Sequence, residues 1–340
     1  MTLTLPVGVA LAGCQAPRTS TSPESSPSVS SIGQQAAKAY LAAHPSPGAS
    51  ASAAAGDQPA QSAPPTAGPA QQAAPTQAQA QAPAPAPPAV NPLLPLLAPA
   101  PATRPPGLDD SWRLVFGDEF DAPVLDTAKW VTNVWQGAQC GANSGNHGSQ
   151  NCYSPSAVTQ SDGKAHLTAS RAPYNFKGRT FPYTSGIINS DQRYFFTYGY
   201  VDVRAKLPKG KGFWPAIWLY NPAYTLDEID IMEFIGEDQT TIFQTLHTRH
   251  GSENQFKTRH SDWSADYHNF AVRWEPGSLT FYIDGVQTGH LTSLVPSEKM
   301  YLMVNLDVGG SSSWGGAPNS ATQFPSSVDI DYVHIYQQAP

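Results

Sequence analysis

All eight tryptophans of this chain, and 34 of its 35 aromatic side chains, lie after residue 107. The first 107 residues instead hold 21 of the 33 prolines and only five of the 45 charged residues. A segment with so few large apolar side chains cannot bury enough surface to offset the entropy of an ordered backbone. The sequence therefore predicts one folded domain over 108–340, a size that sandwiches and barrels reach, after a disordered segment.

The N-terminal residues are apolar and end in Leu11-Ala12-Gly13-Cys14, which resembles the bacterial lipobox, where the cysteine is lipidated and becomes the mature N-terminus. No Lys or Arg precedes Cys14, although a signal peptide normally starts with one. An incidental cysteine in an alanine-rich stretch is the alternative. We expect a signal peptide over 1–14, a Pro/Ala/Ser/Gln-rich linker over 15–107, and an extracellular or cell-surface lipoprotein.

Charge and apolar runs limit the partners that we expect, and the cysteines allow a disulfide. Residues 108–340 carry 16 Lys and Arg against 24 Asp and Glu, with no basic patch, so we expect no nucleic acid partner. We expect a monomer. Because no run of about 18 apolar residues is present, we expect it to contact the membrane only through its lipid anchor. If Cys14 is lipidated, Cys140 and Cys152 remain as a pair that an oxidising compartment favours as a disulfide; two free thiols are the alternative.

Short runs of alternating polar and apolar residues fill the predicted domain, such as 164–169, 200–206 and 279–283, the last followed by Asp284-Gly285. Alternation with period two predicts strands, and Asp-Gly predicts a hairpin turn. No stretch of a dozen residues shows a helical period. The sequence therefore predicts an all-β, antiparallel sandwich.

One predicted strand, with the sequence DEIDIMEF, is unusually acidic. On a regular strand Glu228 and Asp230 share a face, and Glu233 points the other way. A β-bulge at Ile231-Met232 would add one residue and bring Glu233 to the same face. Three crowded carboxylates repel one another and raise at least one pKa, which favours a catalytic role. A calcium site and a solvated edge strand are the alternatives.

The segment Glu228–Glu233 resembles the bulged E-x-D-x-x-E signature of glycoside hydrolase family 16, in its laminarinase-like branch. Further motifs similar to the family's occur in the same order: WRLVF from 112, TSG from 184, YGY from 198, RAKLP from 204, FWPAIW from 213, NLDVGG from 305 and DIDYVHIY from 329. The resemblance implies a β-jelly roll of the concanavalin A-like lectin/glucanase type, with a substrate cleft on its concave face.

Carried over residue by residue, the resemblance implies that Glu228 is the nucleophile, Glu233 the general acid/base and Asp230 the residue between them. Two carboxyl groups about 5 to 5.5 Å apart suit a retaining glycosidase. The implied activity is endo-hydrolysis of internal β-1,3 linkages of a laminarin-like β-glucan by double displacement. A β-1,3-1,4-glucan, galactan or exopolysaccharide substrate, transglycosylation, and a non-catalytic carbohydrate-binding module are the alternatives.

Flat aromatic side chains are expected to bind the polysaccharide. Trp214 and Trp218 lie four residues apart, so they share one face if the segment is extended; core packing is the alternative. The resemblance implies further substrate contacts from His247 near the acid/base, the loop residue Trp314 and, with a structural role as the alternative, Asn305 and Arg204.

The resemblance also implies a structural calcium ion on the convex side, at Glu119, Gly163 and Asp331, because many family members bind one there. Calcium needs several hard oxygen ligands, including backbone carbonyls that a sequence does not reveal. Catalysis itself is expected to need no cofactor. The segment Gly148–Tyr153 differs from the family's Asn-Glu-Leu-Gln-type motif, which leaves the negative-subsite contacts open.

Overall fold

The computed structural model describes residues 105, 107–133, 140, 148–221, 227–250 and 253–339. Cys14, the predicted signal peptide and the predicted linker up to residue 104 lie outside them. The regular structure of the described residues consists of 18 strands and one short 3-10 helix, Pro155–Ala157. Within these ranges no helix has the length and apolar character needed to cross a membrane. The all-β prediction is confirmed.

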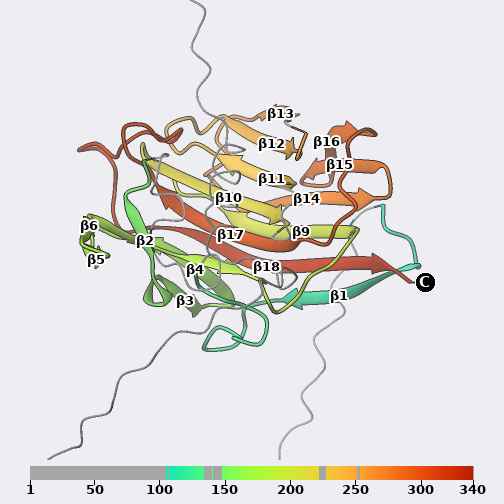
Figure 1. Cartoon of the computed structure of the whole chain (residues 1–340), viewed down its shortest axis with the longest axis horizontal. Coiled ribbons are helices and arrows are strands. Elements are labelled where there is room, and N and C mark those ends of the chain that lie inside the picture. Colours follow the sequence, from blue (N-terminus) through green and yellow to red (C-terminus); the bar gives the residue numbers. More distant parts are fainter. Residues whose placement is uncertain are drawn as a thin grey trace, which may run out of the picture. The chain divides into compact units, whose positions relative to one another are not determined.

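Two antiparallel sheets make up most of the domain (Figure 1). The six-stranded sheet has the order β13 (Glu253–Arg259), β12 (Thr241–His247), β11 (Glu228–Phe234), β10 (Phe213–Tyr220), β17 (Tyr301–Val308) and β8 (Ile187–Asn189). The eight-stranded sheet has the order β16 (Val286–Leu291), β15 (Ser278–Ile283), β14 (His268–Glu275), β9 (Gly199–Lys206), β18 (Ser326–Gln338), β4 (Lys164–Ala169) and β3 (Val158–Ser161), and β1 (Trp112–Asp118) also pairs with β18. Two short pairs complete the set: β2 (Asn151–Tyr153) with β7 (Tyr183–Ser185), and β5 (Tyr174–Phe176) with β6 (Arg179–Phe181).

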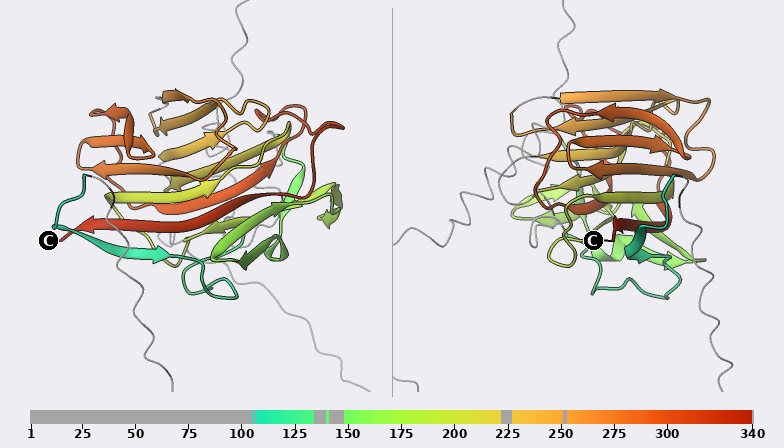
Figure 2. Two further views of the ribbon diagram at one scale, coloured as in Figure 1. Left: turned by 180° about the vertical axis from the view of Figure 1, so that it is seen from behind. Right: turned by 90° about the vertical axis from the view of Figure 1, so that its right-hand side faces the viewer.

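The strands of both sheets turn their apolar residues toward the space between the sheets, so that the domain is a sandwich (Figure 2). From β9 the inner residues are Val201, Val203 and Ala205, and from β17 they include Leu302 and Val304, all with at most 1% of their surface exposed. Each such valine or leucine side chain contributes about 1.5–3 kcal/mol on burial. Because alternate residues enter this core, the residues between them are displayed on the two outer faces.

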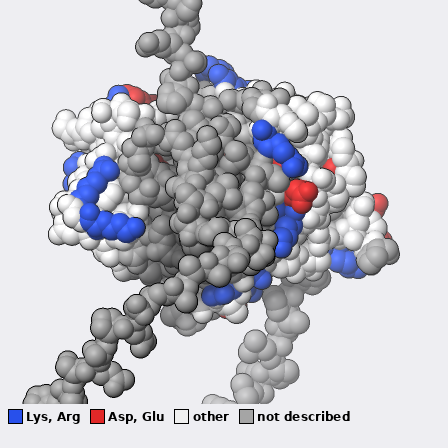
Figure 3. All heavy atoms as spheres, in the orientation of Figure 1, with Lys and Arg blue, Asp and Glu red and all other residues white. Residues whose placement is uncertain are grey.

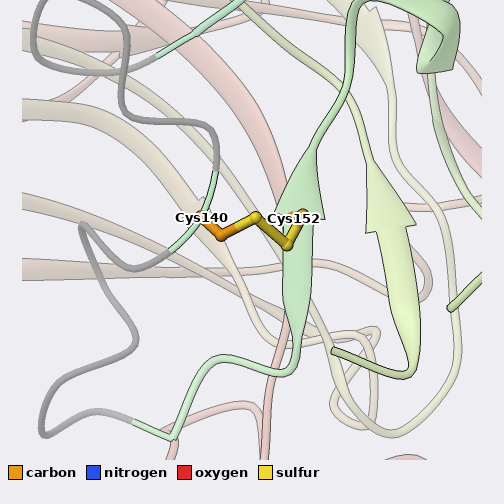
Figure 4. Close-up of a disulfide and its surroundings, with 2 residues drawn as sticks. All are labelled: Cys140 and Cys152. Carbon is orange, nitrogen blue, oxygen red and sulfur yellow. A yellow bond between two sulfur atoms is a disulfide. The ribbon is translucent and has the colours of Figure 1, made fainter. Parts of the chain in front are cut away.

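The segment before β3 is tied to the six-stranded sheet and to a disulfide. The predicted pair Cys140 and Cys152 forms this disulfide (Figure 4). The backbone N–H of Gln150 donates to the carbonyl of Val308 at 2.8 Å, and the Val308 N–H donates to Oδ1 of Asn151 at 2.8 Å. These bonds fix residues 148–153 beside the end of β17.

Charged side chains are sparse on the face shown in Figure 3, where Lys, Arg, Asp and Glu lie singly or in small groups on a mostly uncharged described surface. Only 13% of the whole chain is charged.

Candidate active site

The acidic strand β11 contains a bulge at the place that the sequence predicts. Against β12, Asp230 lies opposite Thr245 and Glu233 opposite Phe243, so three steps along β11 match two along β12. Against β10 the register shifts at the same point. One extra residue therefore lies at Ile231-Met232, and it returns Glu233 to the face that carries Glu228 and Asp230.

The three carboxylates on this face are buried, each with at most 2% of its surface exposed. His247, opposite Glu228 on β12, is the basic side chain beside them. Its Nε2 lies 3.1 Å from Oδ2 of Asp230 and 4.0 Å from Oε1 of Glu228. Hence His247 lies beside the middle carboxylate and the predicted nucleophile, and its charge also acts on the predicted acid/base, Glu233.

Burial and mutual repulsion change the acidity of this group. Burial raises the pKa of Glu228 well above its ordinary value of 4.5, and the negative charge of Asp230 raises it further. Burial, Asp230 and Glu228 in the same way raise the pKa of Glu233, while His247 and a hydrogen bond from Trp214 lower it. Opposing effects therefore act on Glu233 alone, and the two carboxyl groups have different surroundings, as acid–base chemistry by a carboxyl pair needs.

Trp214 holds the predicted acid/base in place. Its indole Nε1–H donates to Oε1 of Glu233 at 3.1 Å. The other oxygen, Oε2, is buried and has no hydrogen-bond partner among the residues that the structure describes. The half-buried ring of Trp314 packs edge-on against Trp214 at 5.6 Å and against Phe243 at 4.7 Å. The structure thus brings two of the three predicted tryptophans, Trp214 and Trp314, to the Glu233 end of the group.

A second polar cluster lies on the same face, beyond β10. Trp218 donates from Nε1 to Oδ1 of Asn305 at 2.8 Å, and Asn305 donates from Nδ2 to the hydroxyl of Tyr153 at 3.1 Å. Asp307 accepts a bond from Ser149 Oγ at 2.6 Å. Sequence reasoning missed Asp307, Ser149 and Tyr153, although the position of Asp307 two residues after Asn305 on one strand already predicts that both share a face.

Arg204 does not lie in this cluster. It belongs to β9 of the eight-stranded sheet, where its neighbours Val203 and Ala205 enter the core, so its side chain lies on the opposite surface of the sandwich. There its Nε donates to Oδ2 of Asp331 at 3.0 Å. Its assignment as a substrate contact is therefore corrected, and the pair with Asp331 agrees with the structural role that was the alternative.

The predicted calcium residues also lie away from the acidic strand. Glu119 contacts His334 at 2.5 Å, and Asp331 pairs with Arg204. Gly163 has a positive φ of 66° beside Asp121, which suits a turn. As these side chains lie, an imidazole contacts the Glu119 carboxylate and a guanidinium pairs with the Asp331 carboxylate, the two side chains that calcium would need. The structural calcium ion therefore stays a prediction.

Within the described residues, one group of side chains has the spacing of a metal site, and it is part of the acidic cluster itself. One ligand atom each from Glu228, Asp230 and His247 lie within 4.8 Å of one another. Burial of two carboxylates beside one imidazole explains this spacing without an ion. A divalent cation bound there would occupy the group needed for acid–base chemistry.

Comparison with known proteins gives the same family over most of the described domain. A family model described as "Glycosyl hydrolases family 16" matches residues 146–334. A glucan endo-1,3-β-glucosidase A1 of Niallia circulans is 30% identical over 66% of this chain and 38% of its own length. A β-glucanase of Rhodothermus marinus is 30% identical over 66% of this chain and 85% of its own length.

Solved structures agree with this result. The laminarinase catalytic domain of Thermotoga maritima has a TM-score of 0.62 at 29% identity, over 67% of this chain and 99% of that one. The endo-β-1,3-glucanase of Pyrococcus furiosus has a TM-score of 0.61 at 28% identity, over 67% of this chain and 95% of that one. With the bulged acidic strand and the sandwich in place, the chain belongs to glycosyl hydrolase family 16.

Proposed function

We propose that this protein is a retaining endo-β-glycanase that hydrolyses internal β-1,3 linkages of a laminarin-like β-glucan. The observation that carries the proposal is the bulge in β11, which places Glu228, Asp230 and Glu233 on one face. Two carboxylates of this kind suit double displacement, in which one attacks the sugar and the other moves a proton.

In the first step Glu233 acts as the acid. Its raised pKa keeps a proton available, and its Oε2 is the oxygen that Trp214 leaves without a hydrogen bond. This proton goes to the glycosidic oxygen as the bond to the anomeric carbon breaks. A carboxylate oxygen of Glu228 forms the new bond to that carbon, which gives a glycosyl-enzyme.

In the second step Glu233 acts as the base: it takes a proton from a water molecule, whose oxygen bonds to the anomeric carbon as the bond from that carbon to Glu228 breaks and frees the Glu228 carboxylate. The negative charge of Glu228 raises the pKa of Glu233. Esterification of Glu228 removes that charge, so the pKa of Glu233 falls and its carboxylate is ionised when it has to take a proton from water. Asp230, with His247 at 3.1 Å, stays beside both groups. The same carboxyl group thus serves both steps because its neighbour changes charge between them.

The choice of a β-1,3-glucan is supported by what the relatives are called, a glucan endo-1,3-β-glucosidase and a laminarinase. It is tested with a panel of laminarin, β-1,3-1,4-glucan, galactan and a bacterial exopolysaccharide, followed by reducing-sugar and linkage analysis. We expect new reducing ends from laminarin, with longer products early in the reaction. Activity on galactan alone would contradict the proposed substrate. Binding to these polysaccharides without the appearance of new reducing ends would indicate a carbohydrate-binding module.

We also propose that residues 108–340 form the catalytic domain of an exported protein that is held at the cell surface through Cys14. The disulfide between Cys140 and Cys152 supports an oxidising compartment. Changing Cys14 to Ser should release the full-length protein from the membrane fraction. An unchanged distribution would contradict the lipid anchor.

A further inference from the structure

Gln244 is a polar side chain on the core side of β12, with none of its surface exposed. Its neighbours on that side, Ile242 and Leu246, belong to the apolar core between the sheets. A buried amide is unfavourable there unless its donor and acceptor are both bonded. Its position in the strand pairing is also special, because Gln244 lies between Phe243 and Thr245, directly opposite the bulge of β11.

The amide of Gln244 bonds to the bulge itself. Its Nε2–H donates to the carbonyl oxygen of Ile231 at 2.9 Å, and the carbonyl of Tyr282 on β15 lies 3.4 Å from the same nitrogen. A bulge interrupts the regular ladder and leaves its extra residue unpaired. Gln244 thus supplies a fixed donor for the carbonyl of a bulge residue two positions before Glu233.

The other end of the amide is held from the second sheet. Oε1 of Gln244 accepts a hydrogen bond from the hydroxyl of Thr288 on β16 at 2.5 Å. Thr288 is itself at an irregular point, because Phe281 pairs with Gly289 and Tyr282 with Gln287. The Gln244 side chain therefore joins a bulge in each sheet across the sandwich, and Thr288 selects the amide orientation that turns Nε2 toward Ile231.

We propose that Gln244 is a positioning residue for the general acid: by holding the Ile231 carbonyl it fixes the bulge that directs Glu233 to the catalytic face, and Thr288 fixes Gln244. The proposal rests on the proposed function in one respect, namely that Glu233 donates the proton. Positioning matters because a displacement of about 1 Å can cost a hundredfold in rate.

The test compares two β-1,3-linked substrates that differ in their need for an acid. Laminarin needs its leaving oxygen protonated, whereas a 2,4-dinitrophenyl β-laminaribioside has a leaving group that departs without a proton. With Gln244→Met, which keeps the length but removes the amide's hydrogen bonds to Ile231, Tyr282 and Thr288, we expect kcat on laminarin to fall by about 30-fold to 100-fold with KM within about twofold. For the dinitrophenyl glycoside we expect kcat/KM within about threefold of wild type.

Three variants make the result specific. Thr288→Val removes only the bond that orients the amide, so it should show the same contrast with a smaller loss on laminarin, about threefold to tenfold. Ser190→Ala is the matched control, since its buried hydroxyl donates to the carbonyl of Tyr194 at 2.9 Å and accepts from the N–H of Leu302 at 3.1 Å, away from the bulge. Ser190→Ala should lower the melting temperature, and any change in activity should be the same for laminarin and for the dinitrophenyl glycoside. Glu233→Gln should show the contrast of Gln244→Met in larger form.

Equal losses on both substrates in Gln244→Met would overturn the positioning role and leave a purely structural one. Unchanged activity on laminarin would overturn it as well. If Gln244→Met does not fold, Thr288→Val alone tests the proposal: a larger loss on laminarin than on the dinitrophenyl glycoside supports it, and equal losses overturn it. Failure of the proposed function is a separate result, because it would appear as an inactive wild type or as a Glu233→Gln variant that still cleaves laminarin.

Discussion

The two outer faces of the sandwich treat their acidic residues differently. On the eight-stranded sheet, Asp331 pairs with Arg204 at 3.0 Å and Asp329 with His166 at 2.7 Å. On the six-stranded sheet, three carboxylates share the single imidazole of His247 within the described residues.

The difference teaches how structure and function can be told apart on one fold. Paired carboxylates on a half-exposed surface contribute little to stability, and their pairing alone does not indicate a function. Buried like charges that raise one another's pKa are unfavourable to folding, and they persist where a reaction uses them. Asp202 on the eight-stranded sheet also has a pKa raised by burial, but hydrogen bonds and positive neighbours lower it. What separates the acidic strand from that face is that neighbouring carboxylates add to burial in raising the pKa of Glu228 and of Glu233.

The largest expected effect comes from the catalytic face. Glu228→Gln should reduce turnover of laminarin below about one per cent of wild type, because it removes the proposed nucleophile. The melting temperature should stay the same or rise, since one of three crowded charges is lost. Initial rates and thermal unfolding measure the two effects, and a clearly active Glu228→Gln enzyme would show that another group attacks the sugar.

The next effect tests the polar cluster that the sequence did not predict. Burial raises the pKa of Asp307 from 3.8 to about 6. A folded-state pKa above the unfolded value gives stability that is complete below about pH 3.8 and is lost as the pH rises through about 6. Between pH 3 and 7, wild type should therefore lose roughly 3 kcal/mol of unfolding free energy relative to Asp307→Asn.

Urea unfolding of both proteins at several pH values measures this difference. The exposed Asp121 provides the control, because Asp121→Asn should keep the pH dependence of wild type. Parallel curves for wild type and Asp307→Asn would mean that burial does not perturb this carboxyl group.

A smaller effect concerns the acid/base itself. The Trp214 indole lowers the pKa of Glu233 by donating to its carboxylate, so Trp214→Phe should raise that pKa. The alkaline limb of kcat/KM against pH should then move up by about one pH unit. Trp218→Phe is the control, because Trp218 donates to Asn305 instead. A limb that stays in place, or moves down, would contradict the assignment of Glu233.

The smallest effect is expected on the opposite face. Arg204→Met breaks the pair with Asp331, in which both side chains are 35% exposed. We expect KM and kcat for laminarin to change less than about twofold, and stability to fall by less than about 1 kcal/mol. A large rise in KM would return Arg204 to the substrate-binding residues and would blur the contrast between the two faces.

The sequence predicts those features that depend on local spacing. The all-β fold and the offset between Glu228 and Glu233 follow from period-two alternation and one extra residue. The wrong placement of Arg204 and the missed role of Asp307 share another cause, because each depends on which strands become neighbours. Gln244 is the same case: its sequence neighbours do not reveal a bulge in the facing strand or Thr288 in the opposite sheet.

The most direct test of the central claim is the stereochemistry of the first bond cleavage. If the bulge in β11 sets Glu228 and Glu233 at the short spacing of a double-displacement site, the new reducing end keeps the β configuration. Proton NMR of laminarin during the first minutes should show the β-anomer signal first, with the α-anomer growing later by mutarotation. Early appearance of the α-anomer would contradict the account, because it would mean an inverting site with more widely spaced carboxylates.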